Sequence, residues 1–222
     1  MGIKLKDRPL PDYTRGEECM NMVTHIVGGA VGIAALVLCV VISAVRGNGY
    51  GLAGSIVFGV SMILLYTMSS VYHGLKPGMG KRVLQVLDHC TIYVLIAGTY
   101  TPILLSAMRP VDPVMSWTML GVMWALAAVA ITLTAVDMKK YRIFSMICYL
   151  GMGWAAVVCI PLLIKAVTWA GFFIILLGGV AYTIGAVLYG LGRKRRYMHS
   201  VFHIFVVLGS VLHTVAILLY AL

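Results

Sequence analysis

Two histidines near the end of the chain, His199 and His203, are four residues apart, which places both side chains on one face of a helix. Two imidazoles placed in this way can bind a single metal ion. The spacing alone is a weak signal, but His73 and Asp88 offer a third imidazole and a carboxylate. Three neutral imidazoles with an open fourth position are typical of catalytic zinc, which lowers the pKa of a coordinated water to about 7.

These polar residues lie in stretches apolar enough to cross a membrane, where an ionisable side chain costs about 2.5–3.5 kcal/mol and needs a partner or a purpose. A helix rise of about 1.5 Å per residue, counted from the nearest basic residue, places all four about 5–10 Å inside the same membrane boundary. We therefore predict that the three histidines bind one zinc ion and that Asp88 orients or deprotonates its water.

Ser69 lies four residues before His73 and so on the same helical face. Its hydroxyl can hydrogen-bond the water, a substrate group or a ligand imidazole. The alternative for Ser69 is a hydroxyl bonded to the backbone of its own helix.

Three further polar residues, Glu17, Asn21 and His25, follow one another at four-residue steps at the start of the first apolar stretch. This face is expected to look into the protein, close to the proposed ion. It either supports or gates the metal site, or it supplies helix capping and hydrogen bonds between helices.

Two other histidines are expected to lie apart from the ion. His213 is about 25 Å beyond Arg196 along its helix, which suits a hydrogen bond in the outer half of the protein. His89 points about 100° away from Asp88, which favours packing or an indirect role.

The elements that must position these residues are membrane-spanning helices. The 222 residues are 61% hydrophobic and 11% charged, which would leave a water-soluble protein of this size without a polar surface. Each crossing takes about 20 apolar residues. We predict an all-α fold, a seven-helix transmembrane bundle over residues 22–222, after a cytoplasmic N-terminal segment, residues 1–21. The spans are predicted at residues 22–45, 52–75, 86–108, 114–136, 143–164, 167–191 and 199–221.

Basic residues set the expected orientation of these spans. Fourteen of the 17 lysines and arginines precede the first span or fall in alternate loops, and the other loops hold Arg46, Arg109 and Lys165. The positive-inside rule then puts the N-terminus in the cytoplasm and, with an odd number of spans, the C-terminus outside. This distribution favours topology and contact with anionic lipids over nucleic-acid binding, despite a net charge of +10.

Several short motifs together resemble the haemolysin III proteins. In chain order they are Glu17-Glu18-x-x-Asn21-x-x-Thr24-His25, Ser69-x-x-Tyr72-His73, Leu87-Asp88-His89, Thr99-Tyr100-Thr101-Pro102 and His199-x-x-x-His203. That group is similar to the progestin and adipoQ receptor superfamily and, more distantly, to the alkaline ceramidases. The resemblance implies a zinc ion held by His73, His199 and His203, with Asp88 near its water and Ser69 close by. It also implies a multi-pass protein of the bacterial cytoplasmic membrane.

Two functions are compatible with this pattern. The first is an intramembrane zinc hydrolase that cleaves a lipid amide or ester, with the acyl chain between helices and Asp88 passing a proton to the leaving group. The second is non-enzymatic: the ion joins the second and seventh helices, and the protein senses or adjusts the membrane or forms a lytic, haemolysin-type assembly. Membrane lipids are the expected partners in both cases.

Overall fold

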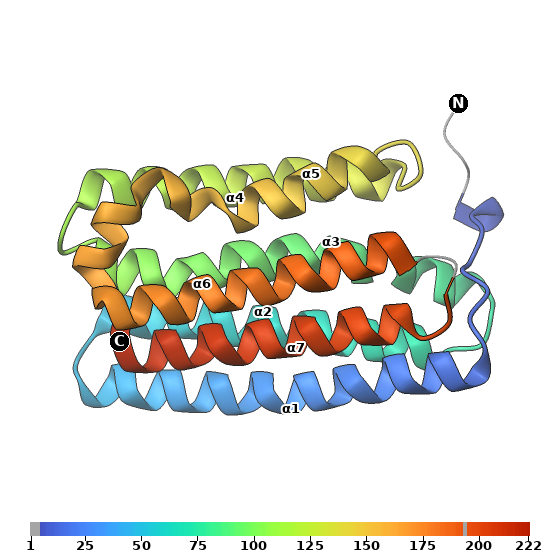
Figure 1. Cartoon of the computed structure of the whole chain (residues 1–222), viewed down its shortest axis with the longest axis horizontal. Coiled ribbons are helices and arrows are strands. Elements are labelled where there is room, and N and C mark those ends of the chain that lie inside the picture. Colours follow the sequence, from blue (N-terminus) through green and yellow to red (C-terminus); the bar gives the residue numbers. More distant parts are fainter. Residues whose placement is uncertain (1–4, 193–194) are drawn as a thin grey trace.

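The computed structural model describes residues 5–192 and 195–222, and these residues form an all-helical bundle (Figure 1). Lys4, Arg193 and Lys194, which are among the basic residues counted above, lie outside the described residues. The long helices are α1 (Arg15–Val45), α2 (Gly49–Gly74), α3 (Met79–Pro102), α4 (Pro113–Val136), α5 (Arg142–Gly153), α6 (Ile160–Gly192) and α7 (Met198–Ala216). Short helical segments add η1 (Leu5–Asp7), η2 (Ile103–Met108), η3 (Ala155–Cys159) and η4 (Ile217–Ala221).

Several helices begin where the sequence offers a capping side chain. Thr14, Asn48 and Asp112 each accept a hydrogen bond from a backbone N–H in the first turn of α1, α2 and α4. Such residues satisfy donors that have no partner within the helix. Pro113 is the first residue of α4 and directly follows the capping residue Asp112. Proline is tolerated there because the N–H that it lacks would have no partner within the helix.

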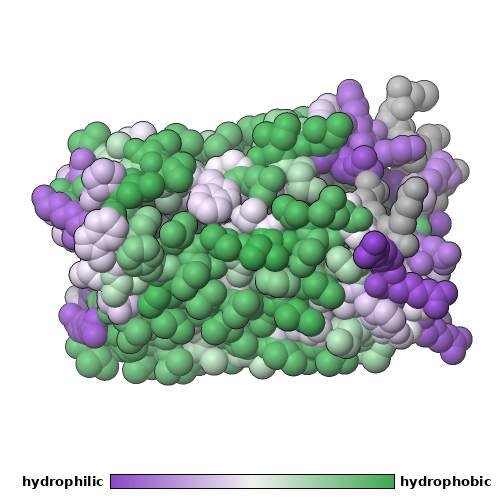
Figure 2. Space-filling model, viewed as in Figure 1, coloured by the Kyte–Doolittle hydropathy of each residue, from purple (hydrophilic) through white to green (hydrophobic). Residues whose placement is uncertain are grey.

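Six helical stretches of the described chain are long and apolar enough to cross a membrane. They are Arg15–Val45, Gly49–Gly74, Met79–Met108, Pro113–Val136, Arg142–Gly192 and Met198–Ala221. Figure 2 shows apolar side chains over the middle of the visible face and hydrophilic ones at its two ends. A surface of this kind matches the apolar core and polar boundaries of a bilayer.

The predicted spans 143–164 and 167–191 both fall within Arg142–Gly192. This stretch is a single one of the six that are long and apolar enough to cross a membrane. The stretch is interrupted by the 3-10 segment η3 and by Thr168, which has φ 63° and ψ 171° inside α6. In Figure 1 the chain runs along α5 towards the end that holds the C-terminus and returns along α6. The described chain therefore has six helical stretches that qualify as membrane spans, whereas the sequence predicts seven.

Helices α1 to α4 each pack against the next α-helix in the chain, α6 packs against α7, and α7 also packs against α1. Small residues allow close approach between α1 and α2: a Cβ added to Gly28 would lie 2.5 Å from the ring of Tyr66. Because α1 contacts both α2 and α7, it holds the two helices that carry His73, His199 and His203 next to one another.

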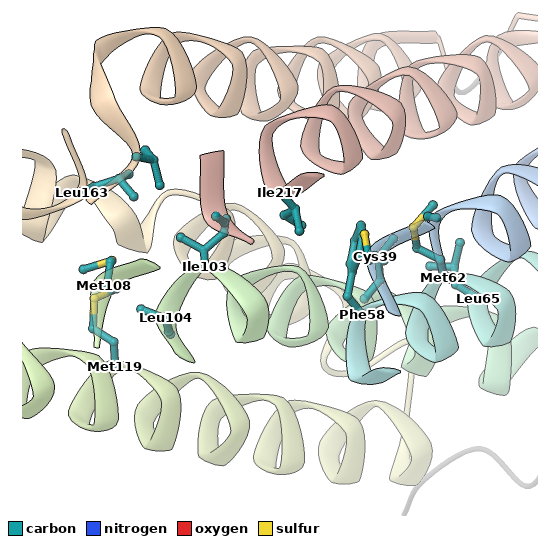
Figure 3. Packing of buried hydrophobic residues seen from close by; sticks show 14 of the residues in the cluster. Cys39, Phe58, Met62, Leu65, Ile103, Leu104, Met108, Met119, Leu163 and Ile217 are labelled. Carbon is teal, nitrogen blue, oxygen red and sulfur yellow. The ribbon is translucent and has the colours of Figure 1, made fainter. Parts of the chain in front are cut away.

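The core away from the histidines is apolar and includes Cys39, Phe58, Met62 and Leu65 (Figure 3). Two prolines coincide with changes of helical form. The helix changes to the π-helical segment η2 directly after Pro102. Pro161 lies at the second position of α6, directly after η3.

Candidate metal centre

His73, His199 and His203 lie together at the end of the bundle where α1 begins, which we call the histidine end (right in Figure 1). Each offers one nitrogen, and the three nitrogens lie within 4.8 Å of one another. His73 belongs to the last turn of α2, and the other two belong to the first turns of α7. The structure thus brings together the three imidazoles that the sequence singles out. That they bind a metal ion stays a prediction.

Hydrogen bonds fix which ring nitrogens are free. The Nδ1 atom of His73 lies 2.6 Å from Oε2 of Glu18, and the Nδ1 atom of His203 lies 3.1 Å from the carbonyl oxygen of Asn21. Nitrogens that face these acceptors carry the proton and donate it, so Nε2 keeps its lone pair on both rings. The sites left for a metal ion are therefore the two Nε2 atoms.

The distance between neighbouring nitrogens fits a tetrahedral ion. The Nε2 atoms of His199 and His203 are 3.1 Å apart. Two nitrogens that each lie 2.0–2.1 Å from tetrahedral zinc are separated by about 3.3 Å. Two neutral imidazoles facing each other this closely have at most one proton to share, whereas a cation between them satisfies both lone pairs.

Burial supports the same assignment. The exposed fractions of His73 and His203 are 3% and 1%. Nε2 of His73 and Nδ1 of His199 are buried and have no hydrogen-bond partner among the described residues. A buried polar atom without a partner costs about 1–3 kcal/mol, and a metal ion would satisfy the His73 nitrogen. The donor set of three imidazoles suits zinc.

Glu18 is the main residue that the sequence analysis missed as part of the site. Its carboxylate accepts hydrogen bonds from Nδ1 of His73 at 2.6 Å and from Nζ of Lys81 at 2.7 Å. Metal-binding histidines usually donate their second N–H to a carboxylate or carbonyl in this way. The available signal was its position three residues before Asn21, which puts both on one helical face.

Glu17 has a structural role at the start of α1. It forms a capping box with Thr14, and its Oε1 accepts a hydrogen bond from the backbone N–H of Tyr197 at 2.8 Å. Glu17 therefore ties the start of α1 to the start of α7. Of the two roles considered for Glu17, the structure shows helix capping and a hydrogen bond between helices.

Asn21 and His25 support the histidines directly. Oδ1 of Asn21 accepts a hydrogen bond from the hydroxyl of Ser200 at 2.6 Å, and its backbone carbonyl oxygen accepts the one from Nδ1 of His203. The ring of His25 stacks on the ring of His203, with centroids 3.5 Å apart and planes 8° from parallel. Both residues therefore join α1 to α7, and the two buried ring nitrogens of His25 have no hydrogen-bond partner in the described chain.

Asp88 and Ser69 lie near His73: Ser69 is one turn before it in α2, and Asp88 interacts with it electrostatically. Both are buried, with exposed fractions of 9% and 0%. The Asp88 carboxylate interacts electrostatically with His73 and lies close to Ser69, and its Oδ2 is 3.9 Å from Nδ1 of His89. The Ser69 hydroxyl has no partner with full hydrogen-bond geometry in the described chain, so the backbone bond considered for it is not formed.

The other two histidines bond elsewhere. Nε2 of His213 lies 3.0 Å from the carbonyl oxygen of Ile175 and so links α7 to α6. Nδ1 of His89 lies 2.8 Å from the carbonyl oxygen of Gln85 in its own helix. Neither belongs to the group of three, in agreement with their spacing.

Tyr13 is a second residue of the site to which the sequence analysis gave no role. Its ring stacks on His199, with centroids 5.3 Å apart and planes 13° from parallel, and lies 5.9 Å from the ring of His73. It precedes α1, so the N-terminal segment reaches over the histidines.

The sequence matches one known protein family. Residues 13–214 match the family described as Haemolysin-III related. The chain is 35% identical over 208 residues to "Hemolysin-3 homolog" of Bacillus subtilis (strain 168), which covers 94% of this chain and 96% of that protein. It is also 35% identical over 206 residues to "Hemolysin-3" of Bacillus cereus, covering 93% and 92% of the two chains.

A more distant relative comes from animals. The chain is 25% identical over 169 residues to the human "Monocyte to macrophage differentiation factor", covering 72% of this chain and 67% of that protein. This likeness supports the relation to the progestin and adipoQ receptor superfamily. With the apolar helices, the Bacillus relatives identify a multi-pass protein of the bacterial plasma membrane. The chain belongs to the haemolysin-III related family.

Proposed function

We propose that this protein is an intramembrane zinc-dependent hydrolase that cleaves an amide or ester bond of a membrane lipid. The observation that carries the proposal is the group of three imidazoles, two buried and one half-buried, whose nitrogens lie within 4.8 Å of one another. The buried carboxylate of Asp88 interacts electrostatically with one of them, His73. A purely structural ion needs no additional buried acid next to it, because burying a carboxylate is costly. In hydrolysis, this carboxylate would act as the general base and general acid.

The residues divide the work as follows. His73, His199 and His203 would hold the ion, which when bound activates water and polarises a carbonyl oxygen. Glu18 and the Asn21 carbonyl keep the ring protons on Nδ1. A carboxylate oxygen of Asp88 can accept a proton from water and return it to the leaving amine or alcohol.

Ser69 completes the proposed group of catalytic side chains. Its hydroxyl is buried, lies near Asp88 and has a free hydrogen-bonding capacity within the described structure. It can donate a hydrogen bond to a substrate carbonyl as negative charge develops there. Water is kept scarce by the burial of the surrounding histidines, which strengthens such interactions.

The proposal includes seven crossings, with the N-terminus in the cytoplasm and the C-terminus outside. It is supported by the break at Thr168, which divides Arg142–Gly192 into two arms. η1 and the C-terminus lie at opposite ends of the bundle (Figure 1), as an odd number of crossings requires. By the positive-inside rule the histidine end then faces the cytoplasmic leaflet, and the substrate is a lipid of that leaflet.

A non-enzymatic function is the second candidate, and the printed names of the Bacillus relatives favour a lytic form of it. In that case the ion would only join α2 to α7 around α1. His203→Ala would then lower thermal stability, while Asp88→Ala would leave function intact.

A lipid-hydrolysis assay separates the two candidates. Zinc-loaded full-length protein in nanodiscs is incubated with ceramide-like and phospholipid substrates, and released fatty acid is measured. We expect release by the wild type and by Asp7→Asn, which removes an exposed carboxylate, but none by Asp88→Asn. Absence of fatty acid release from every substrate would count against the hydrolase and favour the structural ion.

A further inference from the structure

The segment that precedes α1, residues 8–14, crosses the histidine end of the bundle, and we call it the strap. One end of the strap is fixed by Arg8. Its Nη2 donates hydrogen bonds to the carbonyl oxygens of Ala135 and Val136 at 3.1 and 3.0 Å, in the last turn of α4. Its own carbonyl oxygen accepts a hydrogen bond from Nε of Arg82 in α3 at 3.0 Å. Arg8 thus latches the strap to two helices.

The other end of the strap lies over the histidines. Tyr13 stacks on His199, and Thr14 then caps α1. Pro9 and Pro11 lie between the latch and this ring, and each fixes its own φ near −65°. A stiff connection of this kind transmits the position of the latch to the ring of Tyr13.

Two of the three histidines are buried, and the third, His199, is half-buried with the ring of Tyr13 stacked on it, so something must move before an ion or a substrate can reach all three. His73 and His203 are 3% and 1% exposed. The helices around them are held by long packed interfaces. The strap, in contrast, is held at its far end by solvent-exposed hydrogen bonds to two carbonyls, and segments held in this way open most readily.

We infer that the strap is a latched lid over the three histidines, and that release of Arg8 from α4 controls the exchange of metal ions and water-soluble solutes with the site. The inference deepens the proposed function and rests on it for the identity of the ion. Arg8 lies ahead of residues 13–214, which match the family, so the latch is a feature of this chain rather than of the matched region.

The first test needs no metal. Metal-free full-length protein in detergent is treated with diethyl pyrocarbonate, which modifies accessible imidazoles, and each histidine is followed by mass spectrometry. In Arg8→Ala we expect His199 to be modified at least about tenfold faster, because two hydrogen bonds from a charged donor are lost. His213, in the other half of α7, should react at an unchanged rate in both proteins.

The matched control is Arg15→Ala, which removes an exposed arginine from the same end of the bundle without touching the latch. It should react as the wild type does. Equal rates at His199 in Arg8→Ala and the wild type would overturn the lid. So would a parallel increase at His213, because that result means general loosening of the bundle.

A second test uses zinc itself. With the latch removed, uptake and release of zinc should accelerate by the same factor, so the equilibrium affinity and the zinc content stay unchanged. A slower uptake or a weaker affinity would show that Arg8 shapes the site rather than access to it. If even the wild type binds no zinc, the proposed function fails. The modification rate at His199 in metal-free protein still shows whether the strap acts as a lid.

Discussion

At the scale of single residues, Glu18 is the side chain that turns three nearby histidines into an oriented site. It holds the Nδ1 proton of His73 and is itself held by Lys81, which is almost fully buried. A carboxylate in this position fixes the tautomer and the orientation of the imidazole ring. The buried ammonium keeps the carboxylate charged and in place.

Glu18→Gln should therefore weaken zinc binding by about 10–100-fold, the usual effect of losing such a partner. The affinity is measured by competition with a chromophoric chelator. Glu17→Gln is the matched control: it changes the neighbouring carboxylate, which caps α1 and does not touch a ligand ring. Equal affinities of the two variants would remove Glu18 from the site.

Residue types and spacing were enough to single out the histidines and Asp88, because ionisable groups within apolar spans are rare and the depth of each can be counted from basic residues. Contacts between distant segments could not be counted in this way. Tyr13 meets His199 only because the strap folds back over α7, and Glu18 meets His73 only through the packing of α1 on α2.

At the scale of helices, α1 is the element on which the site depends. It packs against both α2 and α7, and its contact with α2 requires small residues on one face. Gly28 lies against the ring of Tyr66, whereas an added Cβ at its neighbour Gly29 would lie at an ordinary 3.8 Å from that side chain. The two glycines therefore offer a matched pair for testing the interface.

Gly28→Ala should destabilise the bundle by about 1–3 kcal/mol, because the new methyl group must displace a buried ring. Gly29→Ala should be neutral or slightly stabilising, since alanine favours the helix. Thermal unfolding of both variants in the same detergent measures the difference. A Gly28→Ala protein as stable as Gly29→Ala would show that α1 and α2 are not packed as described.

Helix positions could be predicted in part from apolar length. The spans predicted at 52–75, 114–136 and 199–221 agree with a helical stretch within three residues, whereas α1 and α3 begin seven residues before the spans predicted at 22–45 and 86–108. The stretch Arg142–Gly192 was harder to divide, because the break at Thr168 comes from one non-helical residue within a continuous apolar run. The π-helical form of η2 could not be predicted either, since Pro102 signals a disturbance and not its geometry.

At the scale of the whole molecule, the two ends of the bundle differ in chemistry. The histidine end holds the group of three histidines and the strap, and the opposite end holds the C-terminus (Figure 1). In the proposed function, the site exchanges with water at the histidine end, and lipid surrounds the sides of the bundle. This arrangement suits a substrate with an apolar chain and a polar head.

The proposed orientation predicts where each end of the chain lies. Alkaline phosphatase, which is active only outside the cytoplasm, should be active when fused after Leu222 and inactive when fused after Lys140, in the loop between α4 and α5. Enzymatic activity on intact cells measures this. Activity after Lys140 but not after Leu222 would reverse the orientation.

The central claim is that His73, His199 and His203 hold one zinc ion, and metal analysis of the purified protein tests it most directly. We expect a stoichiometric zinc content in the wild type and in His213→Ala, whose imidazole bonds to Ile175 instead. We expect His73→Ala, His199→Ala and His203→Ala each to lose most of the zinc. Full zinc content in all three variants, or a wild type without zinc when purified in its presence, would contradict the account.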